Sequence, residues 1–313
     1  MPGTTPDGLV GKVVGLLSLL AVMPVFALSL PLSFVFGTPS VWQFGEKYRP
    51  SFSYVWSRFM TEGVMGCHLK LVGSRGLYKD GPCVYLANHR AWSDFFIDMY
   101  LTEGRAFILS RYLVVYVFPL FAAPAMFIGA VFAFKRNKPG QHEALNANLD
   151  AHLAAYPDFK GMVVYPEGTR NVRPDALPLR RGLIKYAWSR GLDVQVIIAS
   201  DKEHVLSSHL YSASWGVEIL CGYGEVVSSK AHPNDFEAFF AEVKRSWDAE
   251  WDRVYGAKHA RGTSRAPALK PHAPKVQLVE YTAGATGLLI GYTLACVLVA
   301  ILVVAAVAKR ALA

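Results

Sequence analysis

The chain has 313 residues, of which 52% are hydrophobic and only 18% are charged. Soluble domains are typically about 45–50% apolar and about 25% charged, so this composition indicates membrane-embedded segments beside one ordinary domain. It excludes collagen, an intrinsically disordered chain and a small protein held together by disulfides.

The net charge of +8 suits an anionic membrane surface or a polyanionic substrate, although a basic solvated face gives the same value. No zinc-finger spacing and no basic helix interleaved with aromatic residues is present, so we expect no nucleic-acid partner. The four cysteines include no C-x-x-C pair, and one of them lies in an apolar run. This pattern favours a reduced domain that faces the cytosol.

The N-terminal region, residues 1–45, is expected to be a membrane segment. Residues 13–36 carry no charge, but Pro24 and Pro31 interrupt the run. A kinked span, a re-entrant or interfacial hairpin and a cleaved signal peptide all remain open, although a signal peptide normally has a shorter apolar core and a small-residue cleavage site.

Residues 46–256 are expected to form one domain, in which short β-type runs alternate with helical periods from Gly81 to Gly256. This alternation predicts an α/β fold, in which a single domain has a mixed, mostly parallel sheet flanked by helices. Apolar residues at helical spacing predict helices around 145–156 and 236–254, the second with Gly256 as its C-cap. The expected strands are residues 84–87, 106–109, 128–134, 162–165, 194–199 and 217–220.

A polar segment from Asn88 to Asp94 follows the first of these strands directly. Histidine suits proton transfer near neutrality, but it needs a partner that fixes its tautomer and stabilises the imidazolium. Asp94 is the acid nearest to His89. On one helix, residues five apart point about 140° apart, so the pair can meet only if His89 lies on the turn before a helix that Asp94 begins. An N-capping segment with an exposed histidine is the alternative.

The uncharged run at residues 112–134 contains Pro119 and Pro124. We expect a buried helix–loop–strand unit whose apolar face touches lipid, rather than a membrane span.

A second polar turn follows the expected strand at 162–165 and presents a carboxylate, a hydroxyl and a guanidinium together, in the order Pro166, Glu167, Gly168, Thr169, Arg170. The guanidinium fork matches phosphate oxygens, while a β-turn with a surface Glu–Arg pair is the alternative.

Beyond the central domain, residues 257–282 contain helix breakers and little to bury, and they are expected to be a basic, proline-containing linker. Residues 283–308 carry no charge and as a helix are long enough to cross a bilayer. Basic residues are more numerous before this span than after it, and more numerous after the N-terminal run than before it. Both asymmetries orient the central domain toward the cytosol if both runs span.

Together, the two polar motifs resemble those of the glycerolipid acyltransferase family, whose best-known members are the lysophosphatidic acid acyltransferases. The family's N-H-x4-D motif is matched at residues 88–94 and its [FY]-P-E-G-T-R motif at residues 165–170. The Arg-Arg-Gly step at 180–182, and Pro119 downstream of Arg111, are also similar to the family. The resemblance covers about residues 65–225.

Two stretches depart from the family pattern. Counting from Phe132, Lys135 stands where the family's second motif has arginine, and Arg136 follows one position later. Both therefore remain candidates for a phosphate contact. The fourth motif, residues 192–200, lacks its usual proline, which leaves the acceptor preference open.

The resemblance implies acyl transfer from a thioester, usually acyl-CoA, to a glycerol hydroxyl, with lysophosphatidic acid as the expected acceptor. In that reaction His89 is the general base and Asp94 orients it, with Asn88 and Arg90 in supporting positions. We expect acyl-CoA as a co-substrate, membrane lipids as partners, no cofactor and no metal site. The residues expected around the acceptor phosphate, of which Glu167 and Gly168 also shape the turn, are Lys135, Arg136, Glu167, Gly168, Thr169 and Arg170.

Several alternatives remain open. The acceptor could instead be lysocardiolipin, lysophosphatidylinositol, another lysophospholipid, glycerol 3-phosphate or dihydroxyacetone phosphate, and Arg90 directly after the motif histidine is similar to the lysocardiolipin and lysophosphatidylinositol branch. A transacylase, a thioesterase and a non-catalytic lipid-binding protein are the remaining classes. The expected location is the endoplasmic reticulum membrane.

Overall fold

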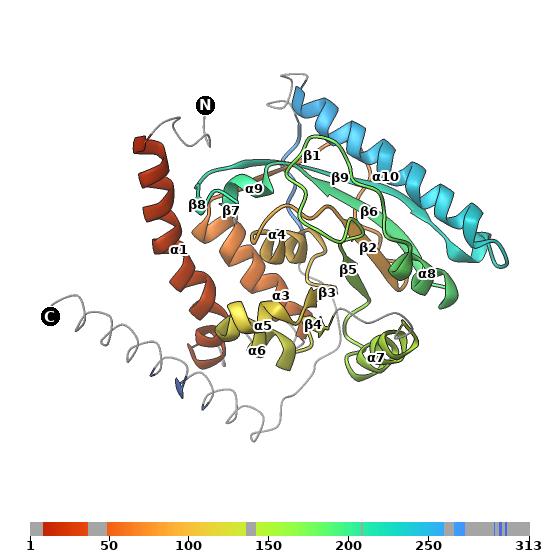
Figure 1. The fold of residues 1–313 in the computed structure, drawn as a ribbon, viewed down its shortest axis with the longest axis horizontal. Coiled ribbons are helices and arrows are strands. Elements are labelled where there is room, and N and C mark those ends of the chain that lie inside the picture. The colour runs from red at the N-terminus through yellow and green to blue at the C-terminus, as the bar shows by residue number, and fades with distance from the viewer. Residues whose placement is uncertain are drawn as a thin grey trace, which may run out of the picture.

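A computed structural model of the chain describes residues 9–36, 49–135, 142–207, 209–259 and 266–272, with positions 291, 294, 295 and 298. Its centre is a seven-stranded sheet with the strand order β1-β9-β6-β2-β5-β3-β4 (Figure 1). The strands are β1 His68–Leu71, β2 Cys83–Ala87, β3 Ala106–Arg111, β4 Val131–Phe134, β5 Gly161–Val164, β6 Asp193–Ala199 and β9 Glu218–Val227. A separate hairpin pairs β7 Leu206–Ser207 with β8 Ser212–Ala213.

The sheet is mixed and mostly parallel, as the sequence predicts. Only β6 and β9 pair antiparallel, and every other neighbouring pair is parallel. Every residue of β2 and β5 is buried. Central parallel strands are covered on both faces, which explains why these segments read as continuous apolar runs rather than as an alternation.

Helices cover both faces of the sheet. Right-handed crossovers put α4, α5 and α6 on one face, where α1 and α3 join them, and put α7 and α8 on the other face with α10, which packs along β9 and β6 (Figure 1). The helices are α1 Leu9–Phe36, α3 Arg49–Arg58, α4 Asp94–Leu101, α5 Leu113–Val117, α6 Pro119–Phe127, α7 His142–Ala155, α8 Arg181–Ser189, α9 Lys202–Val205 and α10 Phe236–His259, with a π-helix at Phe59–Val64 and a 3₁₀ turn at Ser229–Ala231.

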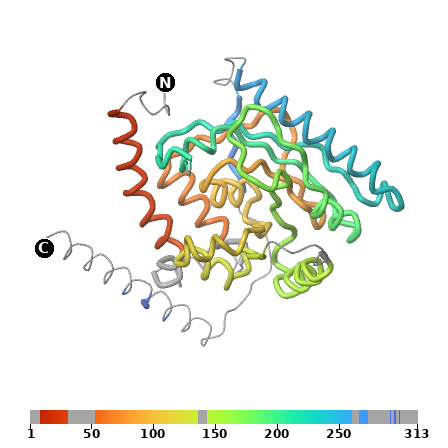
Figure 2. The backbone as a smooth tube through the Cα atoms, viewed as in Figure 1, coloured from red at the N-terminus to blue at the C-terminus, as the bar shows by residue number. Residues whose placement is uncertain are grey.

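The N-terminal run is one helix, which continues through Pro24 and Pro31. It lies beside α6, from which it is distant in sequence (Figure 2). Phe26 is fully buried, and its ring stacks on Phe121 at 5.0 Å and meets Phe118 edge-on at 5.6 Å. Among the described residues, the stretch Leu9–Leu30 of α1 alone is long and apolar enough to cross a membrane, with a mean hydropathy of 2.5.

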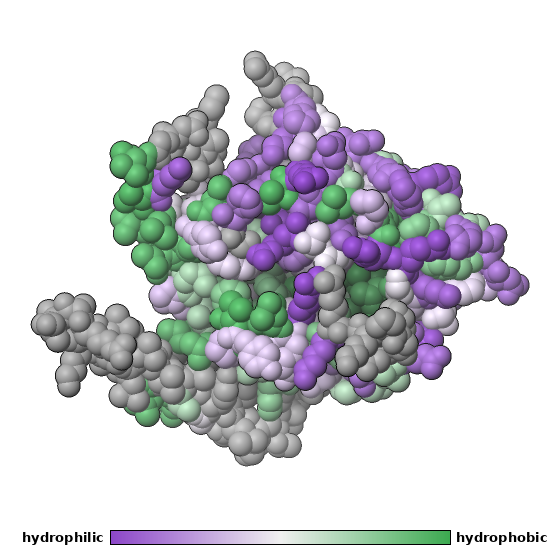
Figure 3. All heavy atoms as spheres, viewed as in Figure 1, coloured by the Kyte–Doolittle hydropathy of each residue, from purple (hydrophilic) through white to green (hydrophobic). Residues whose placement is uncertain are grey.

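The run at residues 112–134 forms two helices and a strand, α5, α6 and β4, but the expected burial holds only in part: α6 and β4 contribute buried residues, and α5 contributes none. The expected strand at 128–134 begins only at Val131, because the preceding residues close the turn after α6. Phe121 is buried, whereas α5 exposes Leu113, Tyr116 and Val117. In Figure 3, apolar side chains gather over α1 and α5, while hydrophilic side chains cover the outer side of α10.

The region expected to be a linker, residues 257–282, is only partly one. Helix α10 continues past Gly256 to His259, and a segment at 266–272 packs against the domain. The Leu269 N–H donates to the carbonyl of Leu69 at 2.9 Å, and the Leu71 N–H donates to that of Pro267 at 2.9 Å. The segment binds here because β1 ends the sheet and leaves backbone groups unpaired on that side.

The predicted C-terminal membrane helix, residues 283–308, lies almost wholly outside the described residues. Within it the structure describes Gly291, Leu294, Ala295 and Leu298, all in helical conformation. Leu294 and Leu298 are exposed. The span itself therefore stays a prediction from the sequence.

Candidate active site

His89 and Asp94 meet at the turn between β2 and α4. The buried strand β2 ends at Ala87 and α4 begins at Asp94, so His89 precedes the helix as the spacing requires. The His89 Nδ1 lies 2.6 Å from the Asp94 Oδ2. The same oxygen accepts the backbone N–H groups of Arg90 at 2.6 Å and Ala91 at 3.1 Å. Asp94 therefore holds both the turn and the imidazole.

Asp94 is almost fully buried, and burial by itself raises a carboxyl pKa. The Lys202 ammonium and the hydrogen bonds from His89 and the Arg90 N–H act in the opposite direction and outweigh burial, so the pKa of Asp94 is lowered. The carboxylate is therefore ionised at neutral pH. An ionised partner at Nδ1 fixes the tautomer that carries its proton there and leaves Nε2 as the basic atom.

The other side of the His89 ring is open enough for a substrate. The ring stacks on Tyr165 at a centroid distance of 4.3 Å, and 26% of the side chain is exposed. No described residue forms a hydrogen bond with Nε2. The imidazole is thus fixed on one edge and one face while its second nitrogen stays accessible.

Asn88 holds strand ends together and does not face the open side of the site. Its side-chain amide exchanges two hydrogen bonds with the backbone of Ala199, at 2.9 and 3.0 Å, and the residue is fully buried. Ala199 ends β6, the neighbour of β2. Asn88 therefore fixes the point at which β2 turns toward His89.

The second motif forms a tight turn after β5. Gly168 has φ +71°, a left-handed conformation that favours glycine, and its N–H donates to the Tyr165 carbonyl at 3.1 Å. Glu167 is buried, and its Oε1 accepts from the Asn171 side chain at 2.7 Å and from the Leu177 N–H at 2.9 Å. Glu167 and Gly168 thus shape the turn, while Thr169 and Arg170 are exposed.

The two motifs are joined directly. The Asn171 N–H donates to the His89 carbonyl at 2.7 Å, so the turn that presents Arg170 is fixed against the histidine turn. Strands β2 and β5 are neighbours in the parallel sheet, and their carboxyl ends lie at one edge. Open α/β sheets hold ligands at this edge.

Cationic side chains follow the next strands along the same edge. The guanidinium of Arg170 forms no hydrogen bond or ion pair with the described residues. Arg111 ends β3 and donates to the Gly168 carbonyl at 2.8 Å, and Lys135 follows β4 with its ammonium over the Tyr112 ring at 5.5 Å. Arg136, the other candidate from the sequence, lies outside the described residues.

Arg111 lies outside the two polar motifs, and the sequence marks it only as a basic position before Pro119. A basic residue shortly after the expected strand at 106–109 was the available signal. It points to the site only once β3 is known to lie next to β5, the strand that carries the second motif, and this strand order comes from the fold.

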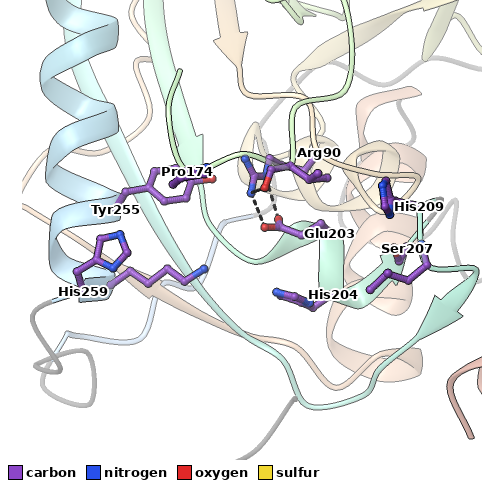
Figure 4. Close-up of a pocket in the computed structure, with 11 residues that line it drawn as sticks. Arg90, Pro174, Glu203, His204, Ser207, His209, Tyr255 and His259 are labelled. Carbon is purple, nitrogen blue, oxygen red and sulfur yellow. Dashed lines mark hydrogen bonds and ion pairs between the residues drawn. The ribbon is translucent and has the colours of Figure 1, made fainter. Parts of the chain in front are cut away.

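Arg90 points toward α9 and the loop after Arg170. Its guanidinium is buried and forms a two-pronged pair with Glu203, and it donates to the carbonyls of Arg173 at 2.8 Å and Val172 at 3.2 Å. Figure 4 shows this pair at the wall of a cavity of about 340 Å³, with His204 and His209 around it. Arg90 therefore supports the loop after the second motif and gives no argument about the acceptor.

Two further residues, which belong to neither motif, lie next to Asp94 on the side away from His89. Lys202 on α9 and Asp98 on α4 are buried next to Asp94. The part of the chain that the structure describes holds no group of three or more His, Cys, Asp or Glu side chains suited to a metal ion.

Comparison with known proteins gives the same family. Residues 68–199 match the family model described as Acyltransferase. The curated human protein 1-acyl-sn-glycerol-3-phosphate acyltransferase beta is 24% identical over 135 residues, which are 43% of this chain and 47% of the relative. The match thus spans about half of that relative.

A solved structure shares the fold. The crystal structure of the 1-acyl-sn-glycerophosphate (LPA) acyltransferase PlsC from Thermotoga maritima aligns with a TM-score of 0.58 and 14% identity. The alignment covers 79% of this chain and 95% of that chain. Residues 68–199 therefore match an acyltransferase domain, and this part of the chain is similar to the 1-acyl-sn-glycerol-3-phosphate acyltransferases.

Proposed function

We propose that this protein transfers an acyl chain from acyl-CoA to the free hydroxyl of lysophosphatidic acid and so makes phosphatidic acid. The observation that carries the proposal is the 2.6 Å contact between His89 Nδ1 and Asp94 Oδ2, which leaves Nε2 accessible in an acyltransferase domain. The curated relative is named for the same acceptor, 1-acyl-sn-glycerol 3-phosphate.

In the proposed reaction, Nε2 of His89 takes the proton from the acceptor hydroxyl while that oxygen attacks the thioester carbonyl. Asp94 stabilises the imidazolium that forms. The tetrahedral intermediate then collapses, the carbon–sulfur bond breaks, and the leaving thiolate receives the proton from His89. An ester and a free thiol result, and no protein nucleophile takes part.

The phosphate of the acceptor would bind at the carboxyl ends of β5, β3 and β4. Arg170 is exposed and has no partner among the described residues, so its charge is available for an anion. Arg111 and Lys135 end the two neighbouring strands and add positive charge. A glycerol hydroxyl close to a phosphate held there would lie within reach of the histidine turn, because Asn171 joins the two turns.

A membrane location suits this substrate, because lysolipid and product both partition into bilayers. The exposed apolar side chains of α1 and α5 form a candidate lipid-facing surface on the side of the domain that bears α6 (Figure 3). The sequence pattern of basic residues favours a cytosolic domain. We extend the proposal to the endoplasmic reticulum membrane because of the resemblance to the glycerolipid acyltransferases and because of the predicted spans.

The test uses the purified full chain in lipid nanodiscs with acyl-CoA and a panel of acceptors. The panel contains lysophosphatidic acid, lysocardiolipin, lysophosphatidylinositol and glycerol 3-phosphate. Mass spectrometry identifies the product, and a thiol reagent measures released CoA. We expect phosphatidic acid and CoA in equal amounts, and the rates of formation of both lowered about 10²-fold or more with His89→Ala.

The other outcomes separate the alternatives. A preference for another acceptor would replace lysophosphatidic acid but keep the chemistry. Thiol release without any acceptor indicates a thioesterase. No thiol release with any acceptor, from a protein that still binds lipid, indicates a non-catalytic lipid-binding protein and contradicts the proposal.

A further inference from the structure

A buried lysine lies directly behind the Asp94 carboxylate. The side chain of Lys202 is 0% exposed. Its Nζ donates to the Asn88 carbonyl at 2.7 Å and to the two Asp98 oxygens at 2.8 and 2.9 Å, and it lies 3.4 Å from the Asp94 Oδ1. The ammonium is therefore held at a fixed point between two carboxylates.

Asp98 connects this ammonium to the other side of the histidine. It lies one helical turn after Asp94 on α4, so both carboxylates point to the same side of the helix. The Tyr165 hydroxyl donates to the Asp98 Oδ2 at 3.0 Å, and the Tyr165 ring stacks on His89. Five side chains thus form a closed ring of contacts that includes the imidazole: His89, Asp94, Lys202, Asp98 and Tyr165.

The charge of this ring depends on Lys202. Burial raises the pKa of Asp98 to about 7, because burial together with the charge of Asp94 outweighs the opposite effect of the Lys202 ammonium. Burial also opposes the charge of Lys202, but Asp94 and Asp98 outweigh it, and the lysine pKa is raised. The titratable and charged groups that face the cluster are His89 and Arg90 from the β2–α4 turn, Tyr165 after β5 and Cys221 on β9.

Packing alone does not explain a lysine at this position. A buried ion pair commonly adds no more stability than apolar residues of similar volume, because desolvation offsets the attraction. The Lys202 ammonium also lies on the opposite side of Asp94 from His89, with a different carboxylate oxygen toward each: Oδ1 toward Lys202 and Oδ2 toward His89. The Lys202 ammonium therefore acts on the Asp94 carboxylate, and Asp94 in turn acts on His89.

We propose that Lys202 is a positioning residue: its ammonium, anchored by Asp98, keeps the Asp94 carboxylate ionised and fixed toward the His89 Nδ1. The inference rests on the proposed general-base role of His89, because Lys202 itself touches no substrate. Removing the ammonium would leave two buried carboxylates beside the imidazole. The His89–Asp94 pair would then take up its proton at higher pH and lose the basic form near neutrality.

The test measures the protonation of the histidine directly and so needs no activity. Diethyl pyrocarbonate modifies the unprotonated imidazole, and mass spectrometry of the peptide that contains His89 gives the extent at each pH. In the full chain, we expect Lys202→Met to move the pH midpoint upward by about one unit or more. Asp98→Asn keeps the cation and removes an anion, so its midpoint should move downward.

The two single variants should shift the pH midpoint in opposite directions, which distinguishes an effect of charge from damage to the fold. The double variant Lys202→Met/Asp98→Asn loses both charges, and its midpoint should return toward that of the native protein. The control is Lys244→Met, which removes an exposed ammonium paired with Asp248 on α10 and should leave the midpoint unchanged. Thermal unfolding verifies that each variant is folded, and if Lys202→Met does not fold, the sign for Asp98→Asn decides.

Kinetics provide the second readout once the acceptor is known. The acid limb of kcat against pH should move with the modification midpoint, while the acceptor KM stays within about twofold. Unchanged midpoints in both single variants, or shifts of the same sign, would overturn the proposal and leave Lys202 a structural residue. A native protein that transfers no acyl chain contradicts the proposed function, and the His89 midpoints still test the role of Lys202.

Discussion

At the site itself, the two nitrogens of one imidazole have different tasks. Nδ1 is bound to a buried carboxylate that also accepts two backbone N–H groups, while Nε2 is accessible. The same division is the basis of histidine base catalysis in general, because the bound nitrogen fixes the tautomer and the free one accepts the proton.

Replacing the base tests this assignment. His89→Ala should lower kcat by about 10²–10⁴-fold, the usual size of positioned general-base catalysis, with little change in the acceptor KM. The measurement is the initial rate of acyl transfer at saturating acceptor. Near-native kcat in a folded His89→Ala protein would contradict the assignment.

Arg170 should act on binding rather than on chemistry. Arg170→Ala removes a charge that would contact the acceptor phosphate before the transition state, so the acceptor KM should rise about tenfold or more while kcat changes less. Arg173→Ala is the matched control, since its side chain is exposed a few residues further along the same loop. An equal effect of both substitutions would mean that the loop contributes only general positive charge.

At the scale of single elements, α7 shows how burial fixes the charge state of a histidine. His152 packs against Phe107 and Phe132 at ring distances of 4.5 and 5.1 Å, and one ring nitrogen contacts the Gly129 carbonyl at 3.1 Å. Burial lowers the pKa of His152, more than the hydrogen bond raises it. The folded protein therefore holds this imidazole neutral.

The sign of the resulting pH effect follows from proton binding. Because the His152 pKa is lower in the folded chain, the unfolded chain binds more protons as the pH falls below about 6.5, and stability is lost over that range. We expect His152→Gln to lose less stability than the native protein between pH 7 and pH 5. Thermal unfolding at both pH values measures the difference, and parallel losses in the two proteins would contradict the prediction.

At the scale of the whole molecule, α1 belongs to the domain as well as to a candidate membrane surface. One side of the helix exposes apolar residues such as Leu20, while Phe26 is fully buried against α6. A helix that only anchored the protein would not need this aromatic contact. Helix α1 therefore also completes the core of the domain.

This double role predicts an asymmetry between two faces of one helix. Phe26→Ala should lower the free energy of unfolding by about 3–5 kcal/mol, the usual cost of removing a buried aromatic ring. Leu20→Ala should have little effect on the domain, because that side chain is 60% exposed. Chemical unfolding of the purified protein in detergent compares the two, and equal effects would show that α1 packs differently.

The sequence by itself determined the chemistry-bearing turns and most of the sheet. Two polar motifs after apolar runs indicated His89 with Asp94 and the turn that ends at Arg170, because these depend on local backbone geometry and residue type. The central strands β2, β3, β5 and β6 were also predicted, since a strand buried on both faces is a continuous apolar run. The short edge strand β1 was not predicted, because a strand of four residues with a single buried residue leaves too weak a pattern.

Only the tertiary structure decided which distant residues share the site. Strand order puts Arg111 beside the turn of Arg170 and Lys135 one strand further along. Helix α9, which follows β6, brings Lys202 behind Asp94, 108 positions later in the chain. The tertiary structure also brings Glu203 to Arg90 and places the segment at 266–272 beside β1. From sequence alone, a lysine is expected on the solvated surface. Whether it is instead buried between two carboxylates depends on tertiary packing, which a local sequence pattern does not predict.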